Sequence, residues 1–469
     1  MADHLEQQTA VHRGLTRKKG VLFVGLLLLI GTSGLLSFAA INGLVKFPSV
    51  AIAPRDLTAI ATAAARAYTA GTTKTGVMDR FDPAHTNWNP YEKVLNTTNV
   101  PGLVPLWSYD TGFSHLGSSS PTIANGIIYM SFGKLYAFDA NCHKACQPLW
   151  SYDIGSITTS SPAVANGIVY VGSEAGGTGK LYAFDASCRS ACQPLWSYSM
   201  GDTVTTVGEE VSSPTVTNGS VYIGIRANGG AVGNLYAFDA SCRSACQPLW
   251  SYPTDGPIDS SPAVANGIVY IHSEAGTLYA FDASCRKACQ PLWSYPTNGS
   301  TIRVSPVVVA NGIVYIASLG DLGVGGKLYA FDASCHKACQ PLWSYTTDGY
   351  IYSSPAVANG IVYIYSGAGK LSTFDANCRS ACQPLWSYTI GNATGFAHST
   401  IAIANGIIYV GSWDEKLYAF DANCRSACQP LWSYTTGNAT GFSSLAVANG
   451  VVYVSAWGGK LYAFGLAVK

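Results

Sequence analysis

The chain has 469 residues, of which 48% are hydrophobic and 11% are charged. Its 27 Lys and Arg residues nearly balance its 26 Asp and Glu residues, which gives a formal net charge of +1. The hydrophobic content excludes a largely disordered chain. Because residues 81–469 contain no basic stripe, we expect no nucleic-acid partner.

The N-terminal region is predicted to anchor the chain in a membrane. Residues 20–45 contain no charged side chain, and about twenty such residues can span a hydrocarbon core of about 30 Å. Four basic residues between Arg13 and Lys19 precede this stretch, so residues 1–19 are predicted to be cytoplasmic and the remainder extracytoplasmic. The alternative is a signal peptide cleaved near Ser37–Ala40, which would release a secreted protein. Residues 46–80 are predicted to form a linker, in which the Ala-rich residues 59–70 could form a short helix.

From about residue 103 onward the chain is built from one repeated sequence unit, and we assign residues 81–469 to the domain that these repeats form. Leu-Tyr-Ala-Phe or a close variant begins at eight positions, and Leu-Trp-Ser-Tyr also occurs eight times, at intervals of 43 to 54 residues. Asn-Gly pairs, β-branched residues and Tyr fill the units, which favours strands over helices. This period is typical of β-propellers, so we predict an all-β, eight-bladed propeller with four-stranded antiparallel blades.

One unit shows how a blade is expected to form. Ser161–Ala165 and Ile168–Gly172 are short apolar strands, and Asn166-Gly167 between them is a favoured two-residue hairpin turn. Leu181–Asp185 and Leu195–Tyr198 supply the third and fourth strands. The first strand should lie innermost, where we expect its edge to need no further strand.

The two ends of the repeats predict how the ring closes. Leu461–Phe464 is followed by no Trp strand, whereas Leu106–Tyr109 is preceded by no first three strands. We therefore expect the N-terminal Trp strand to complete the last blade. The eight repeat Trp side chains are expected to wedge between adjacent blades, each burying roughly 200 Å².

Seven units carry a Cys-x-x-x-Cys loop between the third and fourth strands. Fourteen cysteines in seven pairs favour disulfides in an oxidising compartment. Zinc binding is the rival interpretation, but zinc needs about four ligands and each loop offers two thiols and at most one His. Free thiols, or disulfides between loops, are a third interpretation. Each bridge is expected to restrain its own turn and not to tie one blade to another. The predicted pairs are Cys142/Cys146, Cys188/Cys192, Cys242/Cys246, Cys285/Cys289, Cys335/Cys339, Cys378/Cys382 and Cys424/Cys428.

The unit from Ser161 to Ser173, with Lys180–Ala186 and Leu195-Trp196, closely resembles the pyrroloquinoline-quinone (PQQ) repeat of quinoprotein-like β-propellers of the exported bacterial type. The stretch from His85 to Val100 also looks like the region that precedes the repeats in these proteins. The resemblance implies the fold over residues 80–469, but the family includes both PQQ-dependent dehydrogenases and cofactor-free scaffold lipoproteins. The chain has no Cys-Cys dipeptide of the alcohol dehydrogenase branch, and no residue matches that branch's calcium ligands or catalytic Asp.

The loops of a propeller emerge on two faces. The Asn-Gly turns and Cys loops, nearly invariant among the units, should share one face, which we call the turn face. The second-to-third-strand loops and the connections between blades differ among the units and should share the other, the variable face. Binding residues tend to lie on such loops, so we predict ligand-binding residues there: Glu209, Asp259, Arg303, Tyr352, His398, Trp413 and Trp457. The first five directly precede innermost strands, at the channel mouth, and the two Trp residues could form an apolar wall. Arg226, His272 and Asp414 are further polar residues that interrupt the repeat pattern on this face.

These observations favour a membrane-anchored, extracytoplasmic propeller that acts as a non-catalytic binding or scaffold module. Its partner would be an envelope protein, a glycan or a small ligand. We expect no catalytic residue, no metal site and no cofactor. The alternative is a PQQ-dependent alcohol or sugar dehydrogenase, which would need PQQ and Ca²⁺; a purely structural role in the envelope is a third hypothesis.

Overall fold

The computed structural model describes residues 78–113, 119–155, 160–174, 177–202, 211–227, 231–297, 306–318, 325–351, 353–390, 400–412, 414–425, 428–435, 442–456 and 459–467. The predicted anchor over residues 20–45 and almost all of the predicted linker lie outside these ranges. None of the described residues forms an apolar helix of membrane-spanning length. The short 3-10 helix η1 (Val100–Gly102) is the one helical segment among the described residues.

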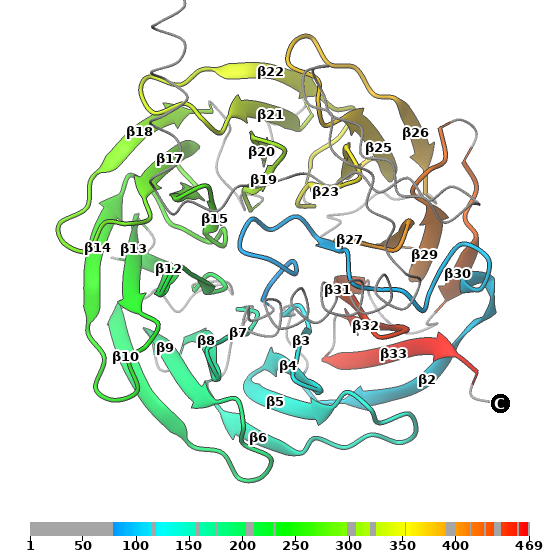
Figure 1. Ribbon diagram of the computed structural model, residues 1–469, viewed down its shortest axis with the longest axis horizontal. Coiled ribbons are helices and arrows are strands. Elements are labelled where there is room, and N and C mark those ends of the chain that lie inside the picture. The colour runs from blue at the N-terminus through cyan, green and yellow to red at the C-terminus, as the bar shows by residue number, and fades with distance from the viewer. Residues whose placement is uncertain are drawn as a thin grey trace, which may run out of the picture. The chain divides into compact units, whose positions relative to one another are not determined.

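Eight antiparallel four-stranded blades follow one another along the chain, one of them joined by a fifth strand near the axis, which confirms the predicted eight-bladed propeller (Figure 1). Blades 1 to 4 consist of β3 (Thr122–Ala124), β4 (Ile127–Phe132), β5 (Lys134–Asp139) and β6 (Trp150–Asp153); β7 (Ala163–Ala165), β8 (Ile168–Glu174), β9 (Thr178–Asp185) and β10 (Pro194–Asp202); β11 (Thr215–Thr217), β12 (Ser220–Ala227), β13 (Val232–Asp239) and β14 (Pro248–Thr254); and β15 (Ala263–Ala265), β16 (Ile268–His272), β17 (Thr277–Asp282) and β18 (Pro291–Pro296).

Blades 5 to 8 repeat this order, and blade 8 takes its fourth strand from the N-terminal side of the repeats. They consist of β19 (Val308–Ala310), β20 (Ile313–Ser318), β21 (Lys327–Asp332) and β22 (Pro341–Thr346); β23 (Ala356–Ala358), β24 (Ile361–Ser366), β25 (Lys370–Asp375) and β26 (Trp386–Thr389); β27 (Ile401–Ala404), β28 (Ile407–Gly411), β29 (Lys416–Asp421) and β30 (Trp432–Thr435); and β31 (Phe442–Ala448), β32 (Val451–Ala456), β33 (Lys460–Leu466) and β2 (Leu103–Asp110).

The first hairpin of each blade forms as the Asn-Gly pairs predict. In blade 2, Ala165 pairs with Ile168 across a turn in which Asn166 has φ 52° and Gly167 has φ 75°. Both values belong to the left-handed region that a two-residue turn of this kind requires. The same positive φ recurs at the Asn of all eight turns, so each blade enters its second strand through the same geometry.

The ring closes at blade 8 as predicted. Strand β2 pairs antiparallel with β33, in a register that runs from Leu103 opposite Leu466 to Asp110 opposite Lys460. Residues more than three hundred positions apart in the sequence therefore complete one sheet.

The hydrophobic core lies between successive blades. At the boundary of blades 1 and 2, Tyr129 and Trp150 pack with Val169 and Phe184 of the next blade, and the Trp150 and Phe184 ring centroids are 5.9 Å apart. Trp150 is 5% exposed. Equivalent clusters join the other neighbouring blades, which confirms the predicted wedging role of the repeat Trp residues.

The innermost strands of blades 4 to 7 bond to a further segment of the chain, which the sequence did not lead us to expect. Residues 78–92, which we call the hub segment, lie inside the ring of blades (Figure 1). Its short strand β1 (Trp88–Asn89) pairs in parallel with β27 of blade 7. Carbonyls of the hub segment also accept hydrogen bonds from the innermost strands of blades 4, 5 and 6, at N–O distances of 2.6 to 2.9 Å. An innermost strand directs alternate N–H groups toward the axis, and the hub segment satisfies those of four blades.

Candidate functional site

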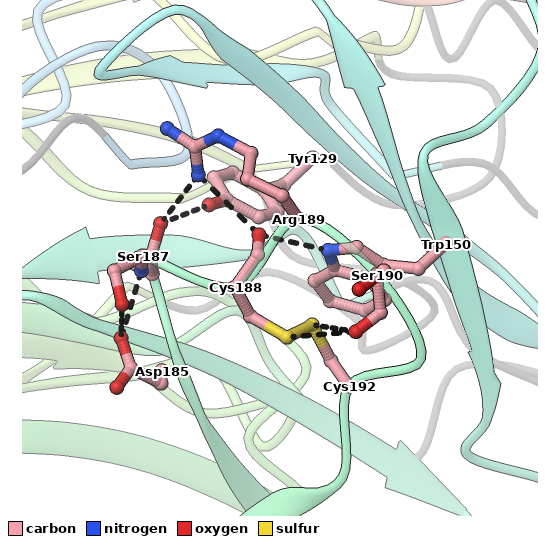
Figure 2. The surroundings of a disulfide bond; sticks show 9 residues. Tyr129, Trp150, Asp185, Ser187, Cys188, Arg189, Ser190 and Cys192 are labelled. Atoms are coloured by element: carbon pink, nitrogen blue, oxygen red, sulfur yellow. Dashed lines mark hydrogen bonds between the residues drawn. A yellow bond between two sulfur atoms is a disulfide. The ribbon is translucent and has the colours of Figure 1, made fainter.

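The turn face is dominated by the Cys loops, whose seven predicted disulfides are all present. Figure 2 shows the loop of blade 2. Asp185 Oδ1 accepts hydrogen bonds from the Ser187 N–H at 2.8 Å and from its hydroxyl at 2.6 Å, and these bonds lower the pKa of Asp185. The bond between Cys188 and Cys192 closes the same turn. Two independent restraints therefore fix the course of its backbone.

This fixed backbone receives side chains of the preceding blade. Trp150 Nε1 of blade 1 donates to the Cys188 carbonyl at 3.2 Å, and the Tyr129 hydroxyl donates to the Ala186 carbonyl at 3.1 Å (Figure 2). The sequence suggested that each disulfide restrains only its own turn. The structure shows instead that it also fixes the acceptors through which one blade holds the next.

The position of the second Cys of every pair also contradicts the expectation that each disulfide restrains only its own turn. This Cys lies in the hydrophobic core and not only in a surface loop. These seven side chains are 2–4% exposed, and each belongs to the cluster that contains the repeat Trp of the preceding blade. The loop directs its second Cys inward, where the sulfur packs at the blade boundary. The disulfides therefore contribute to the contact between blades, and their second sulfurs are not available as surface ligands. The clusters pair Cys146 with Trp107, Cys192 with Trp150, Cys246 with Trp196, Cys289 with Trp250, Cys339 with Trp293, Cys382 with Trp343 and Cys428 with Trp386.

The same pair of hydrogen bonds recurs around the ring, with exceptions in blades 6 and 7. Nε1 of Trp386 in blade 6 has no partner among the described atoms. Trp432 of blade 7 donates to the Leu103 carbonyl, because blade 8 has no Cys loop. Tyr409 of blade 7 is fully buried, and its hydroxyl has no partner in the part of the chain that the structure describes. We assign the turn face a structural role. The recurring Trp bonds are Trp107 to Cys142, Trp196 to Cys242, Trp250 to Cys285, Trp293 to Cys335 and Trp343 to Cys378.

On the variable face, the described residues gather one buried ion cluster at the boundary of blades 3 and 4. Arg226 leaves the end of β12, Asp259 lies in the connection between the two blades, and Glu274 follows β16. Arg226 Nη2 lies 2.7 Å from Asp259 Oδ2 and 2.6 Å from Glu274 Oε1. We call these three residues the blade 3–4 cluster.

Backbone contacts hold the two loops of the cluster together. The Glu274 N–H donates to the Pro257 carbonyl at 2.8 Å, and the Ile258 N–H donates to the Ile225 carbonyl at 3.3 Å. Gly256 makes room for this approach, since a Cβ atom there would lie 2.6 Å from the Ala275 nitrogen. The sequence of the connection thus places both carboxylates against one guanidinium.

The electrostatics of the cluster leave it with one excess negative charge. Burial lowers the pKa of Arg226, but the neighbouring Asp259 and Glu274 outweigh burial and raise it overall, so the guanidinium stays charged. The exposed fraction of the side chain is 24% for Arg226, 6% for Asp259 and 10% for Glu274. A cation that bridges two carboxylates in this way orders the loops around it.

Blade 4 carries a second polar network beside the cluster. Asp255 accepts hydrogen bonds from the hydroxyls of Ser273 and Thr277, and His272 Nε2 lies 3.1 Å from the Thr297 hydroxyl. Burial lowers the pKa of His272 to about 4, against a raising effect of Asp255. His272 is therefore neutral near pH 7 and acts as a buried hydrogen-bonding group.

The structure brings together only part of what the sequence predicted. Asp259 contacts Arg226, a residue that the same analysis noted as interrupting the repeat pattern. Glu274 was missed, because Ser-Glu-Ala-Gly also occurs at Ser173–Gly176 in blade 2 and so belongs to the repeated pattern. The other predicted binding residues lie outside the described residues: Glu209, Arg303, Tyr352, His398, Trp413 and Trp457.

The described part of the hub does not fit PQQ with Ca²⁺. PQQ is a planar tricyclic tricarboxylate, whereas the hub segment leaves beside it a cavity of about 50 Å³. Among the described residues, no group of three or more His, Cys, Asp and Glu side chains is placed to hold a metal ion. Asp79 in the hub segment is buried and engaged by Arg80 and Ser261.

The protein is an eight-bladed β-propeller with a segment of its own chain in the hub and a variable face. Its family follows from its sequence. The family model described as outer membrane protein assembly factor BamB matches residues 86–241, 192–335 and 290–389. The chain therefore belongs to this family of PQQ-like repeat proteins. No curated protein matches the chain.

Solved structures with 15–16% sequence identity share the fold. BamB from Moraxella catarrhalis has 15% identity and a TM-score of 0.54, covering 77% of this chain and 99% of that chain. The quinohemoprotein alcohol dehydrogenase ADHIIG from Pseudomonas putida has 16% identity and a TM-score of 0.62, covering 86% and 82%. The computationally designed protein Ika8 has 15% identity and a TM-score of 0.58, covering 77% and 99%. At this identity the likeness concerns the fold alone.

Proposed function

We propose that this protein is a membrane-anchored, extracytoplasmic propeller that serves as a non-catalytic binding or scaffold module, with an envelope protein as its partner and the variable face as its contact surface. The observation that carries the proposal is the hub. Its described part is filled by residues 78–92 of the same chain, which leave beside them a cavity of about 50 Å³, too small for PQQ. The match to the family model of an assembly factor supports the same conclusion.

The anchor and the location rest on other features. The uncharged residues 20–45 follow a basic N-terminus, which supports a single span with the propeller on the extracytoplasmic side. Seven disulfides support an oxidising compartment. Maleimide labelling of intact cells, with and without prior reduction by an impermeant reductant, tests this location. Labelling that requires the reductant is expected; thiols that react only after cell lysis would contradict it.

A pair of photo-crosslinking variants tests the contact surface. Ala275 on the variable face and Lys287 on the turn face are both exposed and both belong to blade 4. We expect a crosslinker at residue 275 of the full chain to yield a discrete adduct in the envelope, and the same group at residue 287 to yield none. Equal labelling from both positions, or none from residue 275, would contradict the proposal.

The alternative is a PQQ-dependent alcohol or sugar dehydrogenase, which the similarity to ADHIIG favours. Its test is to add PQQ and Ca²⁺ to the purified full chain, then to record bound-cofactor absorbance and dye-linked oxidation of alcohols and sugars. Stoichiometric absorbance with turnover would replace the scaffold proposal. Absence of both, in a preparation that crosslinks from residue 275, would retain it.

A further inference from the structure

A small cavity lies beside the hub segment and is lined by residues of blades 7, 8 and 1. It measures about 50 Å³, and its walls include Ile123 from blade 1, Ala402 from blade 7, and Leu445 and Val447 from blade 8. These four residues are apolar. The hub segment contributes the charged residue Arg80, together with Asn87 and Asn89.

Arg80 reaches this cavity from a backbone conformation that few residues adopt. Its φ is 57°, and that of Phe81 is 79°, in the left-handed region that disfavours side chains other than Gly and Asn. Hydrogen bonds from the Phe81 N–H to the Met78 carbonyl and from the Asn87 N–H to the Arg80 carbonyl, both at 3.0 Å, maintain it. Such conformations cost free energy and concentrate at functional sites.

The guanidinium of Arg80 is only partly paired. Its Nε lies 3.2 Å from Asp79 Oδ2, an oxygen that also accepts from the Ser261 hydroxyl at 3.2 Å. Nη1 is buried and has no hydrogen-bond partner among the described atoms. Because Nη1 lies on the side of the guanidinium opposite the Nε–H, a carboxylate bound at Nε cannot serve it. A buried, unpaired cationic N–H group is costly, so an additional acceptor is expected.

Charge and size define the acceptor. A carboxylate matches the remaining fork of a guanidinium, and an aliphatic chain matches the apolar walls. The other titratable group facing Arg80 is His85, which burial keeps neutral near pH 7. Since a water molecule needs about 10–15 Å³, a cavity of about 50 Å³ holds about four waters, and therefore a ligand of about four non-hydrogen atoms. We propose that the hub cavity is a binding site for an aliphatic carboxylate of the size of acetate, with its head group at Arg80 Nη1 and its methyl group between blades 8 and 1.

Calorimetric titration of the purified full chain with acetate tests this proposal. Saturable binding of one equivalent is expected, whereas acetamide, which has the same shape without the charge, should bind at least tenfold more weakly. Arg80→Gln should weaken acetate binding by tenfold or more. Arg286→Gln on the turn face should leave acetate binding unchanged and serves as the matched control.

A second variant keeps the test decisive if Arg80→Gln fails to fold. Ile123→Phe enlarges a wall residue without touching the guanidinium, and it should abolish acetate binding while the thermal melt stays cooperative. Three results would each overturn the proposal: no saturable binding to the unmodified chain, equal affinity for acetate and acetamide, or unchanged acetate affinity in a folded Ile123→Phe variant.

Discussion

The same substitution at two equivalent Tyr residues should change stability in opposite directions. Tyr170 in blade 2 and Tyr409 in blade 7 occupy matching positions in β8 and β28, and both are fully buried. The Tyr170 hydroxyl donates to the Ala240 carbonyl of blade 3 at 2.9 Å. The Tyr409 hydroxyl has no partner among the described atoms, because blade 8 has no Cys loop to supply one.

The magnitudes follow from these contacts. Tyr170→Phe removes a hydrogen bond worth about 1 kcal/mol and leaves the Ala240 carbonyl buried without that donor, so we expect a loss of about 1–2 kcal/mol in the free energy of unfolding. Tyr409→Phe removes a buried polar group that makes no bond, and burying such a group costs about 1–3 kcal/mol. We expect this variant to gain about 1 kcal/mol. Burial raises the pKa of Tyr409, and Glu92 adds to the shift, so the Tyr409 hydroxyl of the folded, unmodified protein stays protonated.

Urea denaturation of the full chain, followed by intrinsic fluorescence and circular dichroism, measures the difference. Both the midpoint and the slope of each urea transition should be compared, because a protein of this size can depart from two-state unfolding. Losses of equal size in the two variants would refute the reasoning, since the interblade bond would then contribute nothing beyond the packing of the ring.

Three further outcomes follow from the variable face and the Cys loops. Arg226→Met should cost about 3 kcal/mol in the free energy of unfolding, measured by urea denaturation at pH 7, because it leaves Asp259 and Glu274 buried without their shared cation. The folded pKa of His272, about 4, lies below the ordinary value of 6.5. The free energy of unfolding should therefore be unaffected by this residue's protonation above about pH 6.5 and should fall by about 3 kcal/mol as the pH drops from 6.5 to 4. His272→Asn should remove that fall from the pH profile of stability. Replacing the Cys285 and Cys289 pair by Ser should cost about 2 kcal/mol of loop closure, and its combination with Trp250→Phe should cost less than the sum of the two, because both act on the same loop.

Most of the ring could be predicted from the sequence because its determinants are local and repeated. The Asn-Gly turns require positive φ, and the units supply that pair at each first hairpin. Closure of the ring by the strand around Trp107 was also predictable. The last unit has no Trp strand after its third strand, whereas the first Trp strand has no other strands of its blade before it.

The hub segment could not be predicted in the same way. It occurs once, and its course depends on positive φ at Arg80, Phe81, His85 and Asn87, which no local preference enforces except at Asn. Backbone hydrogen bonds with blades 4 to 7 and side-chain hydrogen bonds with blades 3 and 8 select that course. The ion partner of Arg226 escaped detection for a different reason: Glu274 shares its surrounding sequence with blade 2, so its role comes from the neighbouring connection and not from its own unit.

The pairing of β2 with β33 has a consequence for how the molecule is made. A ribosome releases Leu103 long before Leu466, and the contact between them has one of the largest sequence separations in the fold. Contacts of this kind form slowly, because their loop-closure entropy must be overcome before they stabilise anything. Until β33 is in place, β32 and β2 lack the strand that joins them. The chain is therefore exposed to edge-to-edge aggregation before the ring closes, and chaperones that shield strand edges should bind the open form and leave when β33 pairs with β2.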